Sequence, residues 1–431
     1  MQHLLDKRLA ENRPVGVTLI GAGKFGAMFL SQVPTIEGLQ VRTIVDLDID
    51  NAKATCARVG WEDARISSTK FTDDANDALR DEQCEVVIEA TGNPIAGVDH
   101  ALAAIEHGKH VVMVNVEADA LCGVVLAQKA QAAGVVYTMA YGDQPALIWE
   151  MVNWGRLCGF EITAAGKGTR YFDGAHQSTP DTVWEHYGLT SDQAAAAGMN
   201  SQMFNSFLDG TKSAIEMAAV CNATGLLAGD DGLTFPACGV DDLPRLMRPQ
   251  ADGGALQQKG QVEVIASEER DGSPVFRDLR WGVYVVFEAP NDYSADCFRQ
   301  YGLNTDVSGR YASMYKPYHL IGLELSYSVF SAALRQESIG HPRAYVADAV
   351  ATAKRDLKAG ETLDGEGGFT VYGKLMPARA SNSVNALPIG LAHDVLLKQD
   401  VRQGEIVGMA DIDGLAVSTA SAMRNQLLTG T

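Results

Sequence analysis

The sequence predicts an α/β chain with an N-terminal Rossmann-type parallel sheet, a central α+β domain and a small, mostly-β C-terminal domain. Three observations predict this architecture. A chain of 431 residues is long enough for two or three domains. Strand-like apolar runs alternate with helix-like runs through residues 1–142, and this alternation then stops. After residue 343, short segments punctuated by glycine follow. We therefore place the domains at residues 1–142, 143–343 and 344–431.

The N-terminal domain contains five apolar runs that predict strands. They occupy residues 15–20, 41–45, 85–90, 109–114 and 135–139. Helix-like stretches follow the first, third and fourth runs, at residues 27–32, 95–107 and 118–132. Strands that alternate with helices in this way form a parallel sheet with right-handed crossovers. The sequence therefore predicts a doubly wound sheet at this end of the chain.

The rest of the chain has a less regular pattern. Helices are predicted at 146–157, 201–224 and 320–334, with Gly225 as the stop of the second, and strands at 160–166 and 280–288. Within the last domain, the phrases 354–361 and 398–405 resemble each other and both end in Gly-Glu. Two copies are too few for a solenoid. We expect a small module of short strands there.

Charge and composition exclude several classes of function. Lys and Arg number 35 against 54 Asp and Glu, a net charge of −19. Such a surface repels phosphate backbones and anionic lipid, so we expect neither a nucleic-acid nor a membrane partner. No run approaches the roughly 20 apolar residues of a membrane helix, no signal peptide is visible, and the seven cysteines form no CxxC pair. These features predict a cytoplasmic protein with reduced thiols and a small polar substrate.

A glycine-rich turn follows the first predicted strand and opens a predicted helix. The segment Gly21-Ala-Gly-Lys-Phe-Gly26 fits the G-x-G-x-x-G pattern of dinucleotide-binding folds. In that pattern Gly21 permits a tight turn, Gly23 lets a pyrophosphate approach the backbone, and Gly26 lets the helix pack on the strand. We expect the turn, including Lys24 and Phe25, to bind the phosphates of NADH or NADPH. A glycine turn that serves packing alone is the alternative.

Polar residues follow the next predicted strands. Asp46 ends the second strand, where a carboxylate accepts hydrogen bonds from the adenosine ribose. With Asp48 it places two negative charges where NADPH carries its 2′-phosphate, which favours NADH. The turns after the third and fourth strands face the same crevice, so we expect contacts to ribose or nicotinamide from Thr91, Gly92, Asn93 and Asn115. Ordinary turn chemistry is the alternative for these four residues.

Cationic side chains in the central domain are candidates for catalysis. Reduction of a carbonyl by hydride needs a proton donor beside the forming alkoxide. Lys212 is our leading candidate, with Asp209 on the same face of the predicted helix. A surface ion pair is the alternative. At the end of the strand at 160–166, Lys167 is a second catalytic candidate and, with Thr169 and Arg170, is expected to hold a substrate phosphate or carboxylate.

A third group of candidates lies in Met314-Tyr-Lys-Pro-Tyr-His319. Lys316 and His319 are expected to reach a substrate anion or hydroxyl, with Pro317 fixing the start of a helix. A packed helix start is the alternative. No set of metal ligands is readable, because His176, Glu185 and His186 follow no known ligand spacing.

The order of these motifs is similar to that of homoserine dehydrogenases. The glycine turn, 91–94, Asn115 and 141–145 are followed by Ala165-Gly-Lys-Gly-Thr169 and by 207–216, which resembles the catalytic helix of that family. Asn205 and Ser206, just before this helix, are therefore counted as substrate-binding residues. The region 354–411 resembles a SAF domain. Homoserine dehydrogenases carry Asn-Lys after the fourth strand, and Asn115-Val116 here argues against homoserine as the substrate.

The combination resembles SAF-bearing, homoserine-dehydrogenase-like oxidoreductases, nearest the 1-deoxy-D-xylulose 5-phosphate reductoisomerase-like branch. This resemblance implies conversion of 1-deoxy-D-xylulose 5-phosphate into 2-C-methyl-D-erythritol 4-phosphate with NADPH, a step of isoprenoid precursor synthesis. It also implies a divalent cation, Mg²⁺ or Mn²⁺, and a homodimer formed through residues 143–343. Two other functions stay open. One is an NAD(P)-dependent dehydrogenase of a polyol, sugar acid or homoserine-like compound. The other is a cofactor-bound carbohydrate sensor without enzymatic activity.

Overall fold

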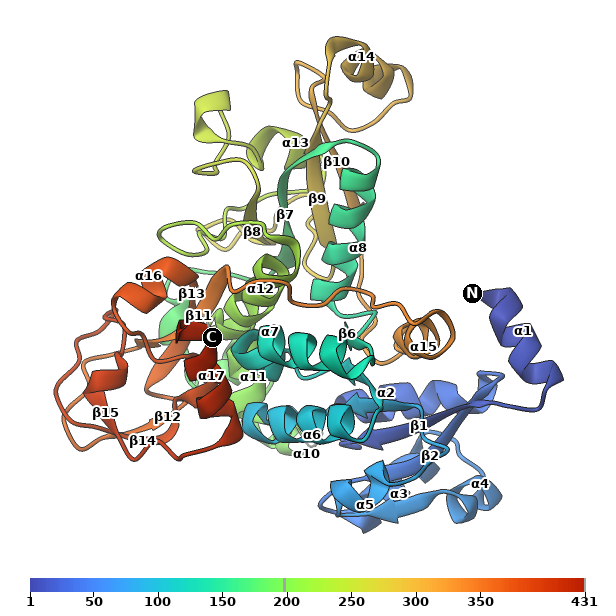
Figure 1. The fold of residues 1–431 in the computed structure, drawn as a ribbon. Helices are drawn as coiled ribbons and strands as arrows, with labels where there is room; N and C mark the ends of the chain where they lie inside the picture. The colour runs from blue at the N-terminus through green and yellow to red at the C-terminus, as the bar shows by residue number, and fades with distance from the viewer. Residues whose placement is uncertain (197–198, 430–431) are drawn as a thin grey trace. The chain divides into compact units, whose positions relative to one another are not determined.

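The computed structural model describes residues 1–196 and 199–429. Contacts within the chain divide it into two compact units, each with sheets of its own (Figure 1). Unit 1 comprises Met1–Leu147, His319–Arg343 and Ser418–Thr431, and unit 2 comprises Ile148–Tyr318 and Ala344–Val417. Unit 2 therefore combines segments of the predicted central and C-terminal domains. The domain boundaries at residues 142 and 343 stay a prediction.

Unit 1 is built on a six-stranded parallel sheet in the order β3-β2-β1-β4-β5-β6. The strands are β1 (Val15–Ile20), β2 (Leu39–Val45), β3 (Lys70–Thr72), β4 (Val86–Glu89), β5 (His110–Met113) and β6 (Tyr137–Met139). The central strands are short, apolar and buried, as is typical of parallel strands that helices cover on both faces. The predicted parallel sheet is confirmed. The sequence does not predict β3, because its three residues contain no apolar run.

Helices connect these strands and complete unit 1. They are α1 (Gln2–Ala10), α2 (Lys24–Gln32), α3 (Ile49–Arg58), α4 (Asp63–Ser68), α5 (Ala75–Leu79), α6 (Pro94–Glu106), α7 (Val116–Ala133), the start of α8 (Gln144–Leu157), α15 (Ser326–Phe330) and α17 (Thr419–Thr429). The chain returns to unit 1 at its C-terminal end, where α17 packs against α6 and α7.

The apolar stretch 320–334 does not form the single helix that the sequence predicts. Only Ser326–Phe330 is α-helical, and a π-helical turn continues over Ser331–Arg335. Before them, Gly322 has a φ of +79°, which a helix does not allow. A Cβ atom at this position would lie 2.8 Å from the carbonyl oxygen of Phe25. The close approach of this turn to α2 therefore replaces the first part of the predicted helix.

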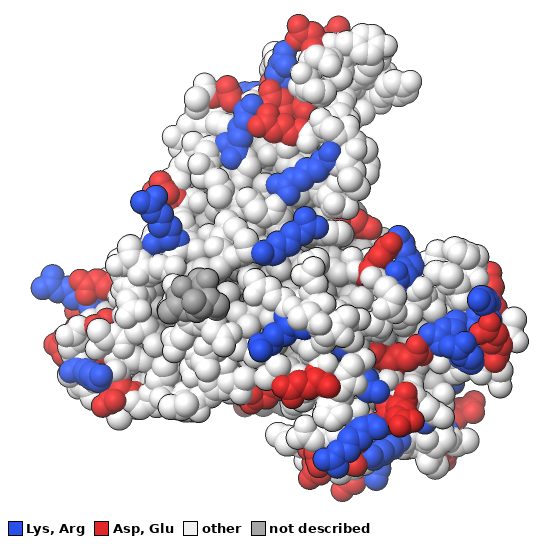
Figure 2. Space-filling model, in the orientation of Figure 1, with Lys and Arg blue, Asp and Glu red and all other residues white. Residues whose placement is uncertain are grey.

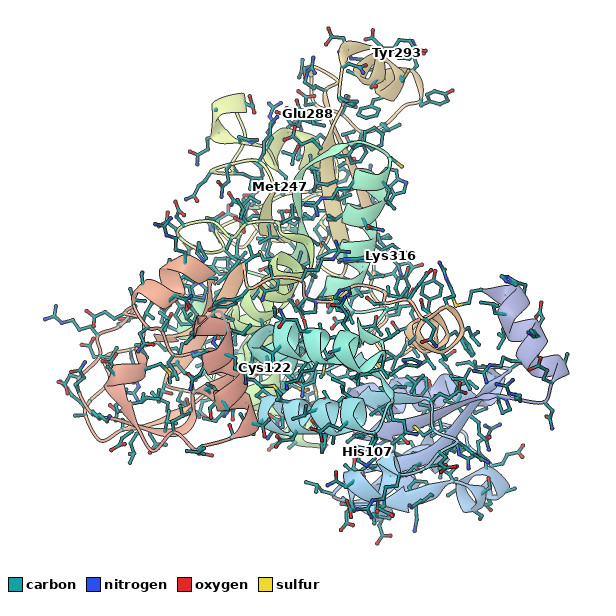
Figure 3. The ribbon with its side chains drawn as sticks, in the orientation of Figure 1. His107, Cys122, Met247, Glu288, Tyr293 and Lys316 are labelled. Carbon is teal, nitrogen blue, oxygen red and sulfur yellow. The ribbon has the colours of Figure 1, made fainter. Side chains whose placement is uncertain are left out.

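Unit 2 contains a four-stranded mixed sheet in the order β10-β9-β7-β8. β7 (Glu161–Thr169) is parallel to β8 (Gln261–Ala266) and antiparallel to β9 (Val283–Glu288), and β9 is antiparallel to β10 (Tyr311–Lys316). Met247, labelled in Figure 3, belongs to the apolar core beside this sheet. The strands predicted at 160–166 and 280–288 are confirmed with shifted ends. Further helices of this unit are α9 (Val183–Tyr187), α10 (Ser191–Ala196), α13 (Leu243–Leu246) and α14 (Asp292–Gln300).

The long helix predicted at 201–224 is two helices. α11 covers Ser201–Leu208 and α12 covers Thr211–Thr224. Between them Gly210 adopts a φ of +87°, a left-handed conformation that ends one helix and starts the next. The predicted stop at Gly225 is confirmed, because this residue caps α12 with a φ of +73°.

The C-terminal part of unit 2 consists mainly of short strands. β11 (Ala347–Ala353) pairs antiparallel with β13 (Val371–Pro377), while β12 (Thr362–Asp364), β14 (His393–Leu397) and β15 (Ile412–Asp413) form a second small sheet, and α16 covers Ala378–Ser383. The two similar phrases lie side by side, because Leu357 and Val401 exchange both backbone hydrogen bonds. α12 packs against β11 and β13 (Figure 1).

Two further sequence features can be followed in the structure. All seven cysteines have free thiols, and Cys122, labelled in Figure 3, is buried on α7. Over residues 1–196 and 199–429, no helix combines the length and hydropathy that crossing a bilayer requires. Acidic and basic side chains are interspersed on the face shown in Figure 2.

Candidate functional site

The glycine turn of unit 1 has the geometry of a phosphate cradle. Gly21 has a φ of +97°, and a Cβ atom there would lie 2.7 Å from the carbonyl oxygen of Ala90. A Cβ atom on Gly26 would collide with the carbonyl oxygen of Gly21, so this glycine permits close helix–strand packing. Gly23, the N-cap of α2, is exposed and has no atom within 4 Å of its Cβ position. The helix therefore presents open N–H groups, which suit an anion.

This turn lies at the point where the strand order reverses. The sheet extends from β1 toward β2 on one side and toward β4 on the other. In open α/β sheets, ligands bind beside the carboxyl ends of the strands at such a position. Of the remaining turn residues, Lys24 is exposed and Phe25 is half-buried against the core of the unit. The observed topology therefore matches the position at which the sequence predicts a dinucleotide.

Asp46 follows β2 and is oriented toward the glycine turn. Its Oδ2 accepts a hydrogen bond from the Ala22 N–H at 2.8 Å, and its Oδ1 accepts one from the Asp48 N–H at 3.0 Å. A carboxylate has about four acceptor positions, so two remain for ribose hydroxyls. The side chain is half-exposed, and the next residue, Leu47, is 94% exposed. An apolar side chain in that position is available to pack against an adenine ring.

The residues after β4 and β5 serve as helix caps. Asn93 accepts hydrogen bonds from the first N–H groups of α6, and Asn115 accepts one from the Ala118 N–H at the start of α7. Asn115 also donates to the Asn93 carbonyl at 2.8 Å, which ties the two turns together. Thr91 donates to Glu89, while Thr91 and Gly92 are exposed. Cofactor contacts from these residues stay a prediction, since capping alone accounts for both asparagines.

In unit 2, one face of α12 and the neighbouring strand β7 bring together three charged side chains. Lys212 and Glu216 lie four residues apart, so their side chains leave the helix on the same face. Glu216 is 2% exposed and forms an ion pair with Lys167 of β7, which is 5% exposed. Lys212 is half-buried. The fold therefore brings both predicted catalytic lysines to this face, together with Glu216, which is not among the predicted site residues.

Asp209 does not share a helix face with Lys212 as predicted. It caps the end of α11 and is fully buried. Its carboxylate forms an ion pair with Lys354 at 2.8 Å and accepts a hydrogen bond from the Thr211 N–H at 2.8 Å. The glycine that breaks the helix rotates Asp209 out of the predicted position. Lys354 also donates to the carbonyls of Ser178 and Gly368, so its ammonium ties three other segments of unit 2 to the end of β11.

Asn205 and Ser206, predicted to bind substrate, are buried on α11. The Asn205 amide donates to the carbonyls of Ser178 and Gly367, and the Ser206 hydroxyl donates to the Met203 carbonyl. These bonds hold α11 against neighbouring loops. A direct role in substrate binding stays a prediction for both residues.

The remaining candidates lie at strand ends. Thr169 ends β7 and is half-buried. Arg170 forms an ion pair with Glu268 at 2.9 Å and donates to the His186 carbonyl, so its guanidinium already has protein partners.

Lys316, labelled in Figure 3, ends β10. Its ammonium lies 5.2 Å from the centre of the Tyr318 ring. The segment is therefore a strand where the sequence predicts a helix start. His319 is the first residue of a segment of unit 1. A metal site finds no support, because the described residues contain no group of three or more His, Cys, Asp or Glu that could hold an ion.

Comparison with protein families supports an oxidoreductase. Residues 21–139 match the NAD-binding domain of homoserine dehydrogenase. Residues 142–325 match the catalytic domain of oxidoreductase DRL. The first match covers the glycine turn and Asp46, and the second covers β7, α11 and α12. Together with the Rossmann-type topology, these matches show that residues 21–139 resemble an NAD-binding domain and that residues 142–325 resemble an oxidoreductase catalytic domain. Neither match extends beyond residue 325, so the resemblance to a SAF domain stays a prediction.

Solved structures match parts of this chain at low similarity. Biliverdin reductase from Synechocystis sp. PCC 6803, solved with biliverdin and NADP+, is 18% identical over 38% of this chain and 49% of that chain, with a TM-score of 0.28. Homoserine dehydrogenase from S. aureus is 18% identical over 34% and 43%, with a TM-score of 0.24. An oxidoreductase domain protein from Kribbella flavida is 13% identical over 64% and 72%, with a TM-score of 0.34.

This chain spans less than half the length of the first two solved proteins. At these TM-scores the matches carry no argument about the substrate. No curated protein sequence matches the chain.

Proposed function

We propose that this oxidoreductase is a reductoisomerase that converts 1-deoxy-D-xylulose 5-phosphate into 2-C-methyl-D-erythritol 4-phosphate. The observation that carries the proposal is the shared face of Lys212, Glu216 and Lys167 within the segment that matches the catalytic domain of oxidoreductase DRL. The order of motifs along the chain supports the same branch. A sugar phosphate also has the anionic group that a lysine at this face would bind.

The residues of this face suggest how they would act. The glycine turn and Asp46 hold the dinucleotide, which supplies hydride when bound. Lys212 donates a proton to the carbonyl oxygen as it becomes an alkoxide, a contribution of roughly 10²–10⁴-fold in rate. Lys167 is held by Glu216 in a buried ion pair, so its ammonium is fixed in position. A fixed cation next to the substrate orients a phosphate or hydroxyl without further reorganisation.

A steady-state assay of the full chain tests this proposal. The reaction contains 1-deoxy-D-xylulose 5-phosphate with NADPH or NADH, with and without Mg²⁺ or Mn²⁺, and the product is identified by mass spectrometry. We expect oxidation of the dinucleotide together with formation of the branched product. Binding of the dinucleotide without any turnover of this substrate would contradict the reductoisomerase assignment.

A second function is favoured by Asp46. Its carboxylate, beside the glycine turn, suits the free 2′-hydroxyl of NAD better than the phosphate of NADP. This preference fits a dehydrogenase that oxidises a polyol, a sugar acid or a homoserine-like hydroxy compound. The same assay run with NAD+ and such alcohols distinguishes the two. Dinucleotide binding without turnover of any of these compounds would instead support the cofactor-bound sensor.

A further inference from the structure

A pocket in unit 2 lies apart from the face of α12 that carries Lys212. It has a volume of about 140 Å³. Its polar lining comes from a loop, from β13 and from the segment before α9, and consists of Asp231, Tyr372, Lys374 and His176. Gly210, the N-cap of α12, and Ala214, on α12, contribute a further wall. Lys212 lies midway between these two positions in sequence, and at 3.6 residues per turn its side chain points to the opposite side of the helix.

The ring of His176 is held in one orientation. Its Nδ1 lies 2.7 Å from the backbone carbonyl oxygen of Asp209. A carbonyl oxygen only accepts hydrogen bonds, so Nδ1 must carry the hydrogen. The ring also stacks on Tyr372, with the ring centres 4.4 Å apart. Burial lowers the pKa of His176, so the ring is neutral near pH 7 and Nε2 carries a lone pair that accepts hydrogen bonds.

Nε2 of His176 can accept a shorter hydrogen bond than the one it makes within the protein. This atom lies 3.4 Å from the Tyr171 hydroxyl oxygen, which is long for a hydrogen bond from a hydroxyl. Tyr171 itself is held by stacking on Phe235, another residue of the pocket wall. A ligand hydroxyl in the pocket would therefore find an oriented acceptor whose tautomer is already fixed.

Lys374 supplies positive charge to the same pocket. Among the residues that the structure describes, no carboxylate lies within ion-pair distance of its ammonium. Its aliphatic stem packs close to Gly232, where an added Cβ atom would lie 3.4 Å from Cε of Lys374. Desolvation raises the pKa of Tyr372 to about 12, so its phenol stays protonated and is a hydrogen-bond donor. Asp231, the acidic residue of the lining, is exposed and accepts a long contact from Gln257.

We propose that this pocket binds a small hydroxylated anion, with its negative group facing Lys374 and its hydroxyl donating to Nε2 of His176. An apolar cavity of about 150 Å³ accommodates benzene, so a ligand of roughly six to eight non-hydrogen atoms fits. This size and chemistry describe a short hydroxycarboxylate. None of the lining residues belongs to the glycine turn, and the proposal does not depend on hydride transfer.

Isothermal titration calorimetry with D-glycerate tests the proposal, with propionate, glycerol and inorganic phosphate as comparison probes. Propionate lacks the hydroxyl groups, and glycerol lacks the charge. We expect D-glycerate to bind at least tenfold more tightly than propionate or glycerol. Tighter binding of phosphate than of D-glycerate would show an anion site without hydroxyl recognition and would overturn the proposal, as would the absence of D-glycerate binding.

Two variants locate the binding within the pocket. Lys374→Met keeps the apolar stem against Gly232 but removes the charge. His176→Asn keeps a donor for the Asp209 carbonyl but removes Nε2. Each should weaken D-glycerate binding 10- to 100-fold while NADH binding stays unchanged, and Lys398→Met, an exposed lysine of the same unit, should bind as the wild type. D-glycerate binding at wild-type strength in both pocket variants would place the ligand elsewhere and refute this assignment.

Discussion

At the scale of single residues, burial and pairing divide the predicted site residues into two groups. Gly23, Asp46 and Lys212 retain exposed surface. Asn205 and Asp209 are fully buried and have partners within unit 2. A residue must reach the cofactor or the substrate to act on it, so the first group carries the predictions that follow.

Gly23→Val should abolish dinucleotide binding in a protein that still folds. The backbone φ of −67° is an ordinary one, and no atom lies within 4 Å of the Cβ position, so the free protein accommodates valine. Valine is a poorer N-cap than glycine, at a cost of about 1 kcal/mol. The added methyl groups would occupy the space of the pyrophosphate. Calorimetric titration with NADH, next to a urea unfolding curve, measures both effects, and wild-type affinity would rule out the cradle.

Asp46→Ser should raise the affinity for NADPH relative to NADH. The substitution removes a negative charge that repels a 2′-phosphate and hydrogen-bonds a free 2′-hydroxyl. Asp48→Ser is the matched control, because Asp48 caps α3 by accepting from the Asn51 N–H and serine preserves that function. The ratio of dissociation constants for the two dinucleotides is the readout. If this ratio changed equally in both variants, the total negative charge near the turn, and not the position of Asp46, would set the preference between NADH and NADPH.

Lys212→Met should lower turnover by roughly 10²–10⁴-fold, the range for loss of a general acid. Methionine keeps much of the apolar stem, so the packing of this half-buried residue changes little. NADH affinity and the thermal unfolding midpoint should therefore stay close to the wild-type values. If turnover also stayed within a few-fold of the wild type, the role of proton donor would pass to Lys167.

At the scale of elements, local patterns were predictable from the sequence and long-range pairings were not. β1 and the end of α12 follow from a β-branched run and from Gly225, both of which are local signals. β8 escaped prediction because Gln261 and Glu263 interrupt its apolar residues, although both are almost fully buried. Hydrogen bonds from Thr234 to Glu263 make that burial possible, and no local pattern shows them.

The residues of the candidate site divide in the same way, into those that a local pattern reveals and those that only long-range pairing brings together. The glycine turn and Asp46 lie within one βαβ unit and have a spacing that can be recognised in sequence. The Lys167–Glu216 and Lys354–Asp209 pairs join segments that are distant in sequence, and only the fold brings them together. The interval between Lys212 and Glu216 is a local signal that these two side chains share a helix face, since four residues separate them, but it does not reveal the partner on β7.

Gly210→Ala should destabilise unit 2 more than Gly225→Ala does. Both glycines have a positive φ, so alanine brings backbone strain of about 1 kcal/mol at either position. At Gly210 the Cβ atom would also lie 3.1 Å from Cε1 of His176 and 3.4 Å from the Phe235 ring, whereas the position at Gly225 is open. We expect a total loss of about 2–3 kcal/mol at Gly210. Chemical unfolding of the two variants gives the difference, and equal losses would show that the contact with His176 relaxes freely.

At the scale of the whole molecule, two buried carboxyl groups link stability to pH. Desolvation raises the pKa of Asp119 to about 7 and that of Glu263 to about 6, above the ordinary values of 3.8 and 4.5. Between the ordinary and the raised pKa, the folded state keeps a proton that the unfolded state has lost. The free energy of unfolding therefore falls as pH rises through these windows. For Asp119 the full effect is up to roughly 4 kcal/mol, at about 1.4 kcal/mol per pKa unit.

Asp119→Asn should remove most of this pH dependence. Oδ1 of Asp119 accepts a hydrogen bond from the Tyr137 hydroxyl at 2.7 Å, and the amide oxygen of asparagine can accept the same bond. The variant should therefore resemble the protonated wild type at pH 4 and be more stable than the wild type at pH 8, with a smaller slope left by Glu263. Asp99→Asn, an exposed change on α6, is the control and should leave the slope unaltered. Urea unfolding across this pH range supplies the measurement, and parallel curves for Asp119→Asn and the wild type would show that Asp119 is ionised in the folded protein at neutral pH.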